Sequence, residues 1–258
     1  MTDQRPGQLL RRIWSNPNCV LLVFAGSSAE FAINPAAEWL FYTGKLPADP
    51  IGRFVSTLQY VRRLMFAPSE AAYAHVAREI RALHTGLEKR RGQAIPAVAY
   101  RDVLFMNLEY SIRSFPFVFG RDLTRNEKDG IVADFADIGE LMSVEAMPAD
   151  FEQYQAIRRE RFQAFRYSQW TTKLLEAYRR AIGNFRFRFL LWPVYGGLTA
   201  REIRTTLGVQ PQLNTWFFRW LSYPVCRTGL SGLLYRIFLP PSLYKAFRGW
   251  SGPAAAGL

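Results

Sequence analysis

The sequence predicts an all-α protein, a single multi-helix bundle domain over residues 1–258 with no significant sheet. Three observations predict this fold. Apolar residues recur every three or four positions along most of the chain, which is the helical period. Residues that start and stop helices stand at the ends of these segments. The apolar–polar alternation of a half-buried strand never extends beyond a few residues.

The first three helices follow from the patterns in the N-terminal half. In "DPIGRFVSTLQYVRRLMF", Asp49 is the predicted N-cap and Pro50 the first helical residue. The segment "PSEAAYAHVAREIRALHTGLEKRRG" predicts a helix over 68–92. A third helix is expected over about 97–115 and should end near Pro116, because an interior proline removes a backbone hydrogen bond.

The second half continues with capped helices. Thr124 and Glu127 have the spacing of a capping box, in which each side chain binds the other residue's backbone N–H. The long segment "SQWTTKLLEAYRRAIGNFRFRFLLW" is expected to be helical as far as Pro193. A shorter helix, "LTAREIRTTLG", is predicted to begin at the cap Thr199 and to close at Gly208.

The charge of the chain restricts its partners. Lys and Arg total 33 against 21 for Asp and Glu, a formal charge of +12, which suits nucleic acid, an anionic membrane or an anionic cofactor. Because the basic residues are mostly arginines scattered along amphipathic segments, we expect no nucleic-acid binding. The C-terminal extension, residues 199–250, contains the aromatic and basic segments "WFFRWL" and "LLYRIFLPPSLYKAFRGW", which are typical of peripheral membrane association.

Location and redox state follow from other absences. No uncharged apolar run approaches the about 20 residues needed to span a membrane, and no signal peptide is visible. Cys19 and Cys226 are isolated in apolar surroundings, as expected of buried free thiols in a reducing compartment. We therefore expect a cytoplasmic protein, either free or peripheral on a membrane.

Several chemistries are disfavoured by the motifs. Two histidines and two isolated cysteines are too few for a zinc site of usual spacing. The chain has no ExxH pair, HExxH helix, GxSxG turn, GxGxxG loop or P-loop. Di-iron, hydrolase and nucleotide-binding sites of these kinds are not expected.

His84 is the main candidate for a ligand. It follows Ile80 by four residues and precedes Leu87 by three, so it shares their apolar face, whereas His75 points to the opposite side. One interpretation is a core histidine that satisfies its own hydrogen bonds. The other is a single ligand to buried iron. One imidazole cannot hold a bare ion, but it can complete the coordination of haem.

Arg53 and Thr57 form a second candidate group on the preceding helix. Their i, i+4 spacing places them side by side. They are either a solvated polar edge or the rim of a pocket in which arginine stabilises anionic oxygen and threonine positions dioxygen. Arg62, nine residues after Arg53, is a candidate for binding a haem propionate, as is its neighbour Arg63.

Four segments, taken in order, resemble the MpaB-like oxygenase family, which is related to the latex-clearing protein, a rubber oxygenase. They are "DPIGRFVSTLQYVRRLMF", "REIRALHTGLEKRRG", "AYRDVLFMNLEYSIRSF" and "GRDLTRNEKDGIVADFADIGELM", and the resemblance covers about residues 20–190. It implies an all-α fold of the globin-like or Lcp-like kind. It also implies one haem b in the relatives that cleave rubber.

The resemblance assigns roles to individual residues. It implies that His84 is the metal ligand that holds haem iron, and that Arg53 and Thr57 line the opposite side of the haem. We expect Arg53 and Arg62 to be cofactor-binding residues beside His84, although helical spacing does not say whether Arg62 or Arg63 faces the cofactor. Arg53, Thr57 and Glu38 are the expected catalytic residues, with Glu38 as a base that removes an allylic proton.

Two positions depart from the family pattern. The rubber oxygenase has a lysine directly before the threonine, where this chain has Ser56. Other members carry a histidine in the third helix, where this chain has Glu109 or its neighbours in "FMNLEYSI". The resulting expectation is a haem b-dependent oxygenase that acts with dioxygen on an apolar, alkene-containing substrate of the isoprenoid class. The alternative is a non-catalytic haem- or lipid-binding protein at a membrane surface.

Overall fold

The computed structural model describes residues 5–41, 48–210, 236, 239–247 and 250, and within these ranges the chain is all-α without a strand. In chain order the helices are α1 (Gln8–Ser15), α2 (Pro17–Ile33), α3 (Ala37–Phe41), α5 (Pro50–Met65), α6 (Glu70–Arg91), α7 (Ala97–Phe119), α8 (Arg125–Leu141), α9 (Phe151–Phe162), α10 (Gln169–Ile182), α11 (Asn184–Arg186), the π-helix η1 (Phe187–Leu191), α12 (Trp192–Leu198), α13 (Arg201–Leu207) and α16 (Pro241–Phe247).

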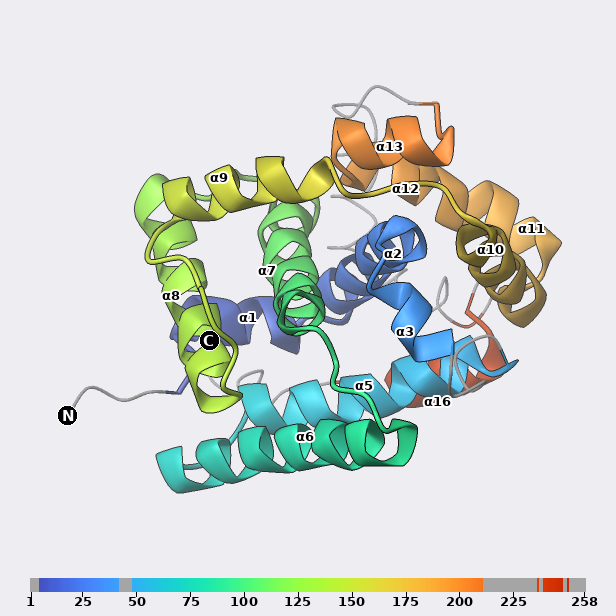
Figure 1. Cartoon of the computed structure of the whole chain (residues 1–258). Coiled ribbons are helices and arrows are strands. Elements are labelled where there is room, and N and C mark those ends of the chain that lie inside the picture. Colours follow the sequence, from blue (N-terminus) through green and yellow to red (C-terminus); the bar gives the residue numbers. More distant parts are fainter. Residues whose placement is uncertain (1–4, 42–47, 211–235, 237–238, 248–249, 251–258) are drawn as a thin grey trace.

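The centre of the fold is the pair α2 and α7, which make the most extensive helix–helix contact. Figure 1 shows the other elements arranged around this pair: α8 and α9 on one side, α10 to α13 on the other, and the α5–α6 hairpin below. Helix α2 lacks an amphipathic pattern because neighbours cover it on several sides. Its buried residues include Val20, Val23 and Ala29.

Gly26 allows the two central helices to approach closely. A Cβ atom at this position would lie 2.1 Å from Cδ1 of Tyr110 on α7, and the Tyr110 side chain is fully buried. The ring cannot move aside without disturbing the core. Glycine is therefore required here by the distance between the helices and not by its backbone conformation.

We expect Gly26→Ala to lower the free energy of unfolding by about 1–3 kcal/mol, the usual cost of overpacking a core. Gly130→Ala on α8 is the matched control, because a Cβ there meets nothing within 4 Å. That substitution should raise the free energy of unfolding by about 0.5–1 kcal/mol through helix propensity alone. Chemical denaturation of both variants checks the prediction, and equal changes would contradict it.

The predicted helix starts around the candidate site are confirmed. The Asp49 side chain accepts a hydrogen bond from the Gly52 backbone N–H at 2.8 Å, and Pro50 is the first residue of α5. The Thr124–Glu127 capping box is present at the start of α8. Helix α6 begins at Glu70, two residues after the predicted start at Pro68, because Ser69 is its N-cap.

The prediction that the third helix ends near Pro116 is wrong. Helix α7 continues to Phe119, and Gly120 ends it with a φ of 74°. Proline costs this helix only its own backbone donor. The side chains of Phe115 and Phe117 stay in the core on both sides of it, and their burial outweighs that loss.

The prediction of one continuous helix up to Pro193 is also wrong. The helix breaks at Gly183, whose φ of 86° favours glycine, and resumes as α11 and the π-helix η1. Pro193 is the second residue of α12, which follows η1 without a break, so the chain stays helical through this proline. Thr199 does not cap α13, because its hydroxyl donates to the Tyr195 carbonyl oxygen at 2.6 Å.

Part of the C-terminal extension belongs to the core. In α16 the side chains of Leu243 and Phe247 are buried against α5, and the Trp250 indole donates to the Trp14 carbonyl oxygen at 3.0 Å. The segment "WFFRWL" and Cys226 lie outside the described residues, whereas Cys19 is a buried free thiol as predicted. Among the described residues, no helix combines the length and hydropathy needed to cross a bilayer.

Candidate functional site

Helices α5 and α6 form the hairpin that positions the candidate site. Only residues 66–69 connect them, so the helices pack side by side and run in opposite directions (Figure 1). The first turn of α5, which carries Arg53, therefore faces the last third of α6, which carries His84. The structure thus places the two residues on neighbouring helices.

The His84 side chain is held in one tautomer. Its Nδ1 atom lies 2.8 Å from the carbonyl oxygen of Ile80, which can only accept a hydrogen bond, so Nδ1 carries the hydrogen. In the neutral ring, Nε2 then has a free lone pair. Within the described ranges, no hydrogen bond to Nε2 occurs. An imidazole with a fixed Nδ1–H and a free Nε2 has the donor chemistry of a metal ligand.

The surroundings of His84 keep its ring neutral. The side chain is half-buried and meets the edge of the Tyr100 ring, with centroids 5.2 Å apart. Burial lowers the pKa of His84 below its usual 6.5, and the positive charges of Arg81 and Arg53 lower it further. The Ile80 and Glu88 groups oppose this effect but do not reverse it.

This pKa has a consequence for stability. As the pH falls below 6.5, His84 becomes protonated in the unfolded chain but stays neutral in the folded protein, whose pKa at this residue is lower. Acidification from pH 6.5 to that lower pKa therefore decreases the free energy of unfolding. We expect His84→Gln to weaken that pH dependence between about pH 7 and pH 5. Denaturation at several pH values measures it, and an NMR titration of His84 with its midpoint above 6.5 would contradict the assignment.

Arg53 and Thr57 occupy the exposed side of α5. The Thr57 hydroxyl donates to the Arg53 carbonyl oxygen at 3.0 Å, so it presents only lone pairs to a ligand. The Arg53 guanidinium is exposed, and within the described ranges no carboxylate forms an ion pair with it. Its charge reaches His84, as the pKa of that ring indicates. The structure thus brings the charge of Arg53 near His84, whereas no contact between the Thr57 side chain and His84 occurs among the described residues.

Arg62 lies elsewhere. It is in the last turn of α5, about 13 Å along the helix axis from Arg53, and its guanidinium stacks on the ring of Trp250 at 5.2 Å. Its neighbour Arg63 pairs with Glu79. The structure does not bring Arg62 beside His84, because the two sites are separated by more than two helical turns.

Glu38 lines a pocket of about 430 Å³ at the far end of α6. The pocket is bounded by α3, the α6–α7 connection, α9 and α10, and its walls include Trp39, Trp170 and Arg91. Arg91 lies seven residues after His84 on the same face of α6, and it donates to the Trp39 carbonyl oxygen at 2.8 Å. Arg91 is therefore about two turns of α6 from His84, and it shares the pocket with Glu38. Among the described residues, the ion-pair partner of Glu38 is Arg166 at 3.8 Å.

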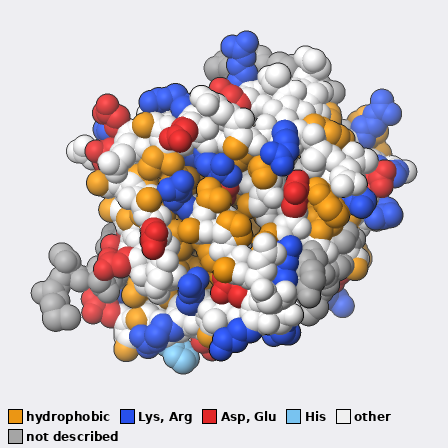
Figure 2. Space-filling model, in the orientation of Figure 1, with side chains coloured by type: hydrophobic (Ala, Val, Ile, Leu, Met, Phe, Trp, Pro, Cys, Tyr) orange, Lys and Arg blue, Asp and Glu red, His pale blue; other side chains and the backbone are white. Residues whose placement is uncertain are grey.

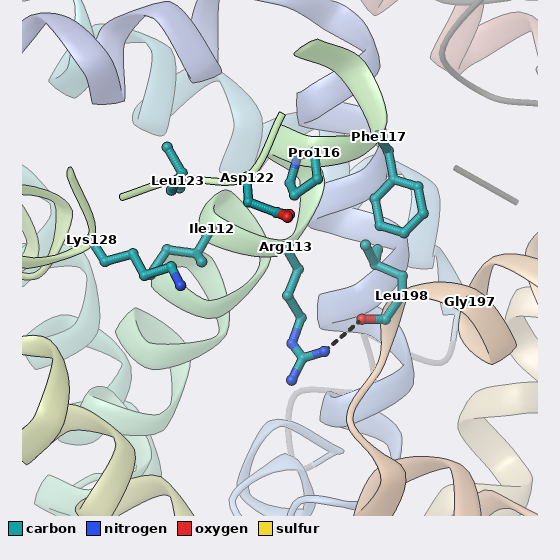
Figure 3. A pocket seen from close by; sticks show the side chains of 9 residues that line it. All are labelled: Ile112, Arg113, Pro116, Phe117, Asp122, Leu123, Lys128, Gly197 and Leu198. Carbon is teal, nitrogen blue, oxygen red and sulfur yellow. Dashed lines mark hydrogen bonds between the residues drawn. The ribbon is translucent and has the colours of Figure 1, made fainter. Parts of the chain in front are cut away.

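A second pocket, of about 230 Å³, lies at the opposite end of α7 (Figure 3). Lys128 and Asp122 stand at its rim, and Arg113 donates to the Leu198 carbonyl oxygen across it. His84 lines neither pocket. Arg91 is the only residue of α6 that lines the larger pocket, so among the residues lining it only Arg91 lies on the same helix as His84.

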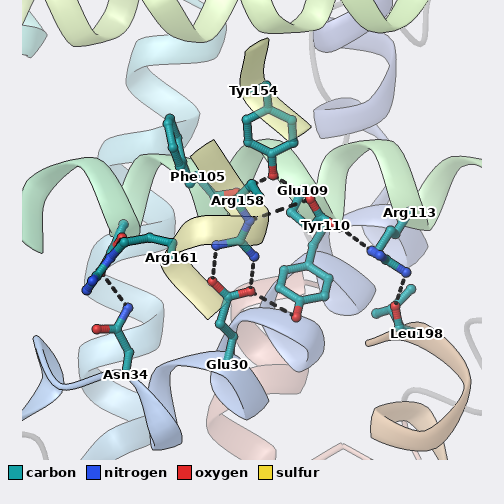
Figure 4. Close-up of polar contacts among 11 residues, drawn as sticks. Glu30, Asn34, Phe105, Glu109, Tyr110, Arg113, Tyr154, Arg158, Arg161 and Leu198 are labelled. Atoms are coloured by element: carbon teal, nitrogen blue, oxygen red, sulfur yellow. Dashed lines mark hydrogen bonds and ion pairs between the residues drawn. The ribbon is translucent and has the colours of Figure 1, made fainter. Parts of the chain in front are cut away.

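A buried ionic network was not predicted from the sequence (Figure 4). Arg158 on α9 donates through both Nη atoms to the Glu30 carboxylate on α2, each at 2.7 Å, and both side chains are buried. Glu109 on α7 accepts hydrogen bonds from Arg113 and from the Tyr154 hydroxyl. The only sequence signal is a lone carboxylate, Glu30, within the apolar run of α2.

The network includes Glu109, which lies in the stretch of α7 where the resemblance implies a histidine in other family members. Burial raises the pKa of Glu109, but Arg113, Arg158 and the Tyr154 hydroxyl outweigh it and hold that pKa at about 2. Glu109 is therefore a permanently ionised structural anchor and has neither the donor type nor the exposure of a histidine ligand. In the described structure, His84 is the only half-buried histidine.

Comparison with known families identifies one that covers most of the chain. No curated protein and no solved structure matches the chain. The family model described as the catalytic domain of ER-bound oxygenase mpaB/B' and rubber oxygenase matches residues 20–228, which include α5, α6 and the residues that surround His84. The chain belongs to this family of oxygenase catalytic domains.

Proposed function

We propose that the protein is a haem b-dependent oxygenase that uses dioxygen to cleave an apolar, alkene-containing small molecule. The observation that carries the proposal is the state of His84: Nδ1–H donates to the Ile80 carbonyl oxygen, and no hydrogen bond to Nε2 occurs among the described residues. A porphyrin supplies four ligands to iron, so one such imidazole is sufficient. The described residues contain no cluster of three or more His, Cys, Asp or Glu that could hold a metal ion by themselves.

Each residue of the hairpin has a defined task in this proposal. His84 would hold the haem iron, and its bond to Ile80 would fix the orientation of the ring. When bound, haem supplies the dioxygen chemistry that no side chain provides. The Arg53 guanidinium places a positive charge where negative charge develops on a reacting oxygen, and the Thr57 lone pairs orient a proton donor beside it.

The substrate follows from the pocket that contains Glu38. Its walls are mainly tryptophan, proline, alanine and valine side chains, which favour an apolar ligand over a polar one. Glu38 is partly exposed there and could accept an allylic proton from the substrate and return it before the carbonyl products leave. Addition of both atoms of dioxygen across one carbon–carbon double bond, with cleavage of that bond, yields two carbonyl groups and balances without another reactant.

Reconstitution tests the proposal. Purified protein is titrated with haemin, and oxygen uptake is then measured after reduction with squalene as the alkene and squalane as its saturated control. We expect a Soret band that saturates at one haem per chain, uptake with squalene only, and carbonyl products. A Soret band without uptake would identify a non-catalytic haem protein, and the absence of a Soret band would refute the proposal.

A further inference from the structure

Two phenylalanine rings project from the surface at the break after α10. Phe185 is 62% exposed and Phe189 is 58% exposed, and their ring centroids are 5.1 Å apart. They contact each other, whereas Phe187 between them contacts Trp192. Large apolar side chains that are mostly exposed and adjacent mark an interaction site more often than scattered single ones do.

The backbone explains why the rings point outward together. Gly183 ends α10 with a φ of 86°, and the π-helix η1 follows within a few residues. The wider π turn shifts the positions of side chains relative to an α-helix, and such turns often occur at functional sites. In Figure 1 this segment lies at the edge of the molecule, on the opposite side from α8 and α9.

Basic residues surround the rings. Residues 177–200 contain four arginines and no Asp or Glu. Arg179, Arg180 and Arg188 are exposed, and within the described part of the chain none forms an ion pair with a carboxylate. The Arg188 guanidinium lies 5.7 Å from the centre of the Phe189 ring. Figure 2 shows Lys and Arg side chains projecting at this edge of the molecule.

We propose that the face formed by the end of α10, α11 and η1, hereafter the Phe185–Phe189 face, binds the surface of an anionic lipid bilayer. The two rings enter the boundary between headgroups and acyl chains, and the arginines bind the phosphates and carboxylates of the headgroups. The inference does not depend on haem. It would, however, place the proposed oxygenase where an apolar alkene is dissolved.

The geometry favours a bilayer over nucleic acid. Arginines also attract nucleic-acid phosphates, and exposed aromatic rings can stack on bases. The rings of Phe185 and Phe189, however, are already in contact, so no base fits between them. In one of the segments that the sequence predicts for membrane association, the described residues Leu243 and Phe247 are buried in the core and do not face a bilayer.

Vesicle flotation with the full chain tests the proposal, using phosphatidylcholine alone and phosphatidylcholine mixed with phosphatidylserine. We expect flotation with the anionic vesicles. The double variants Phe185→Ser/Phe189→Ser and Arg180→Glu/Arg188→Glu should each reduce partitioning at least about tenfold. Leu83→Ser, at a position 51% exposed on α6, is the apolar control. Arg78→Glu/Arg159→Glu is the charge control, with both residues exposed on other helices. Both controls should float like the unmodified protein.

Other outcomes overturn the proposal. These are no flotation of the unmodified protein, or equal flotation of the double serine variant. Loss of self-association in that variant with flotation unchanged would assign the face to a second copy of the chain. Equal binding of single-stranded RNA and vesicles, unaffected by the serine substitutions, would indicate a general polyanion surface. The haem spectrum of each variant reports on the oxygenase proposal separately, so the two can fail independently.

Discussion

The His84→Ala variant is expected to lose the Soret band after haemin titration, with an affinity for haem at least about 100-fold weaker than that of the unmodified protein. Removal of a residue that only hydrogen-bonds to a metal ligand weakens metal affinity by up to about 100-fold. Removal of the ligand itself should weaken it at least as much. His75→Ala is the matched control. His75 is on the same helix, but it is 64% exposed and lies near Glu79. It should leave the spectrum unchanged.

Rescue distinguishes ligation from a general structural defect. In His84→Ala the smaller alanine side chain leaves space for one free imidazole molecule. Millimolar imidazole should therefore restore a Soret band in this variant and have little effect on the spectrum of His75→Ala. Circular dichroism should be the same for both variants, since His84 is only half-buried. A full Soret band in His84→Ala without imidazole would exclude the assignment of His84 and, with it, the site described here.

Arg158→Met is expected to lower the free energy of unfolding by about 3–5 kcal/mol, because it leaves the carboxylate of Glu30 in the core without its cation. Arg158 is 3% exposed and Glu30 is 0% exposed, and the two nitrogen–oxygen distances of 2.7 Å show a bidentate pair. Arg159→Met is the control, since the neighbouring Arg159 is exposed on the same helix. It should change the free energy of unfolding by less than about 0.5 kcal/mol.

The pH dependence of the Arg158→Met variant provides a second readout. Burial already raises the pKa of Glu30, and Arg158 opposes that rise. Without Arg158 the pKa rises further, so the folded variant keeps a proton that the unfolded chain releases above about pH 4.5. The loss of stability should therefore be smaller at acidic pH than at neutral pH. The double variant Glu30→Met/Arg158→Met should recover part of the free energy of unfolding that Arg158→Met loses. If it recovers none, the loss comes from side-chain packing and not from the unpaired carboxylate of Glu30.

Local signals in the sequence predicted the starts of α5 and α8 correctly. Asp49 with Pro50, and Thr124 with Glu127, act within one turn of chain, so neighbouring residues decide their geometry. Pro116 was misread for the opposite reason. The cost of an interior proline is fixed, whereas the burial that offsets it depends on helices distant in the sequence.

The candidate site was predictable to the same extent. Helical periodicity places His84 on the inner face of α6, and the short connection brings Arg53 opposite. Periodicity cannot say which of the α5 arginines lies near His84 or which helix Glu38 approaches, because those are tertiary relations. The bond between Glu30 and Arg158 joins residues 128 positions apart, and no local pattern indicates it.

The Glu30–Arg158 pair also limits how the chain can fold as it leaves the ribosome. Helix α2 is made early, but its carboxylate meets a cation only after α9 has emerged, which requires more than half of the chain. Until then α2 either stays hydrated at that turn or holds Glu30 in its protonated form. We therefore expect the contact between α2 and α7 to reach its full stability only after α9 has been synthesised.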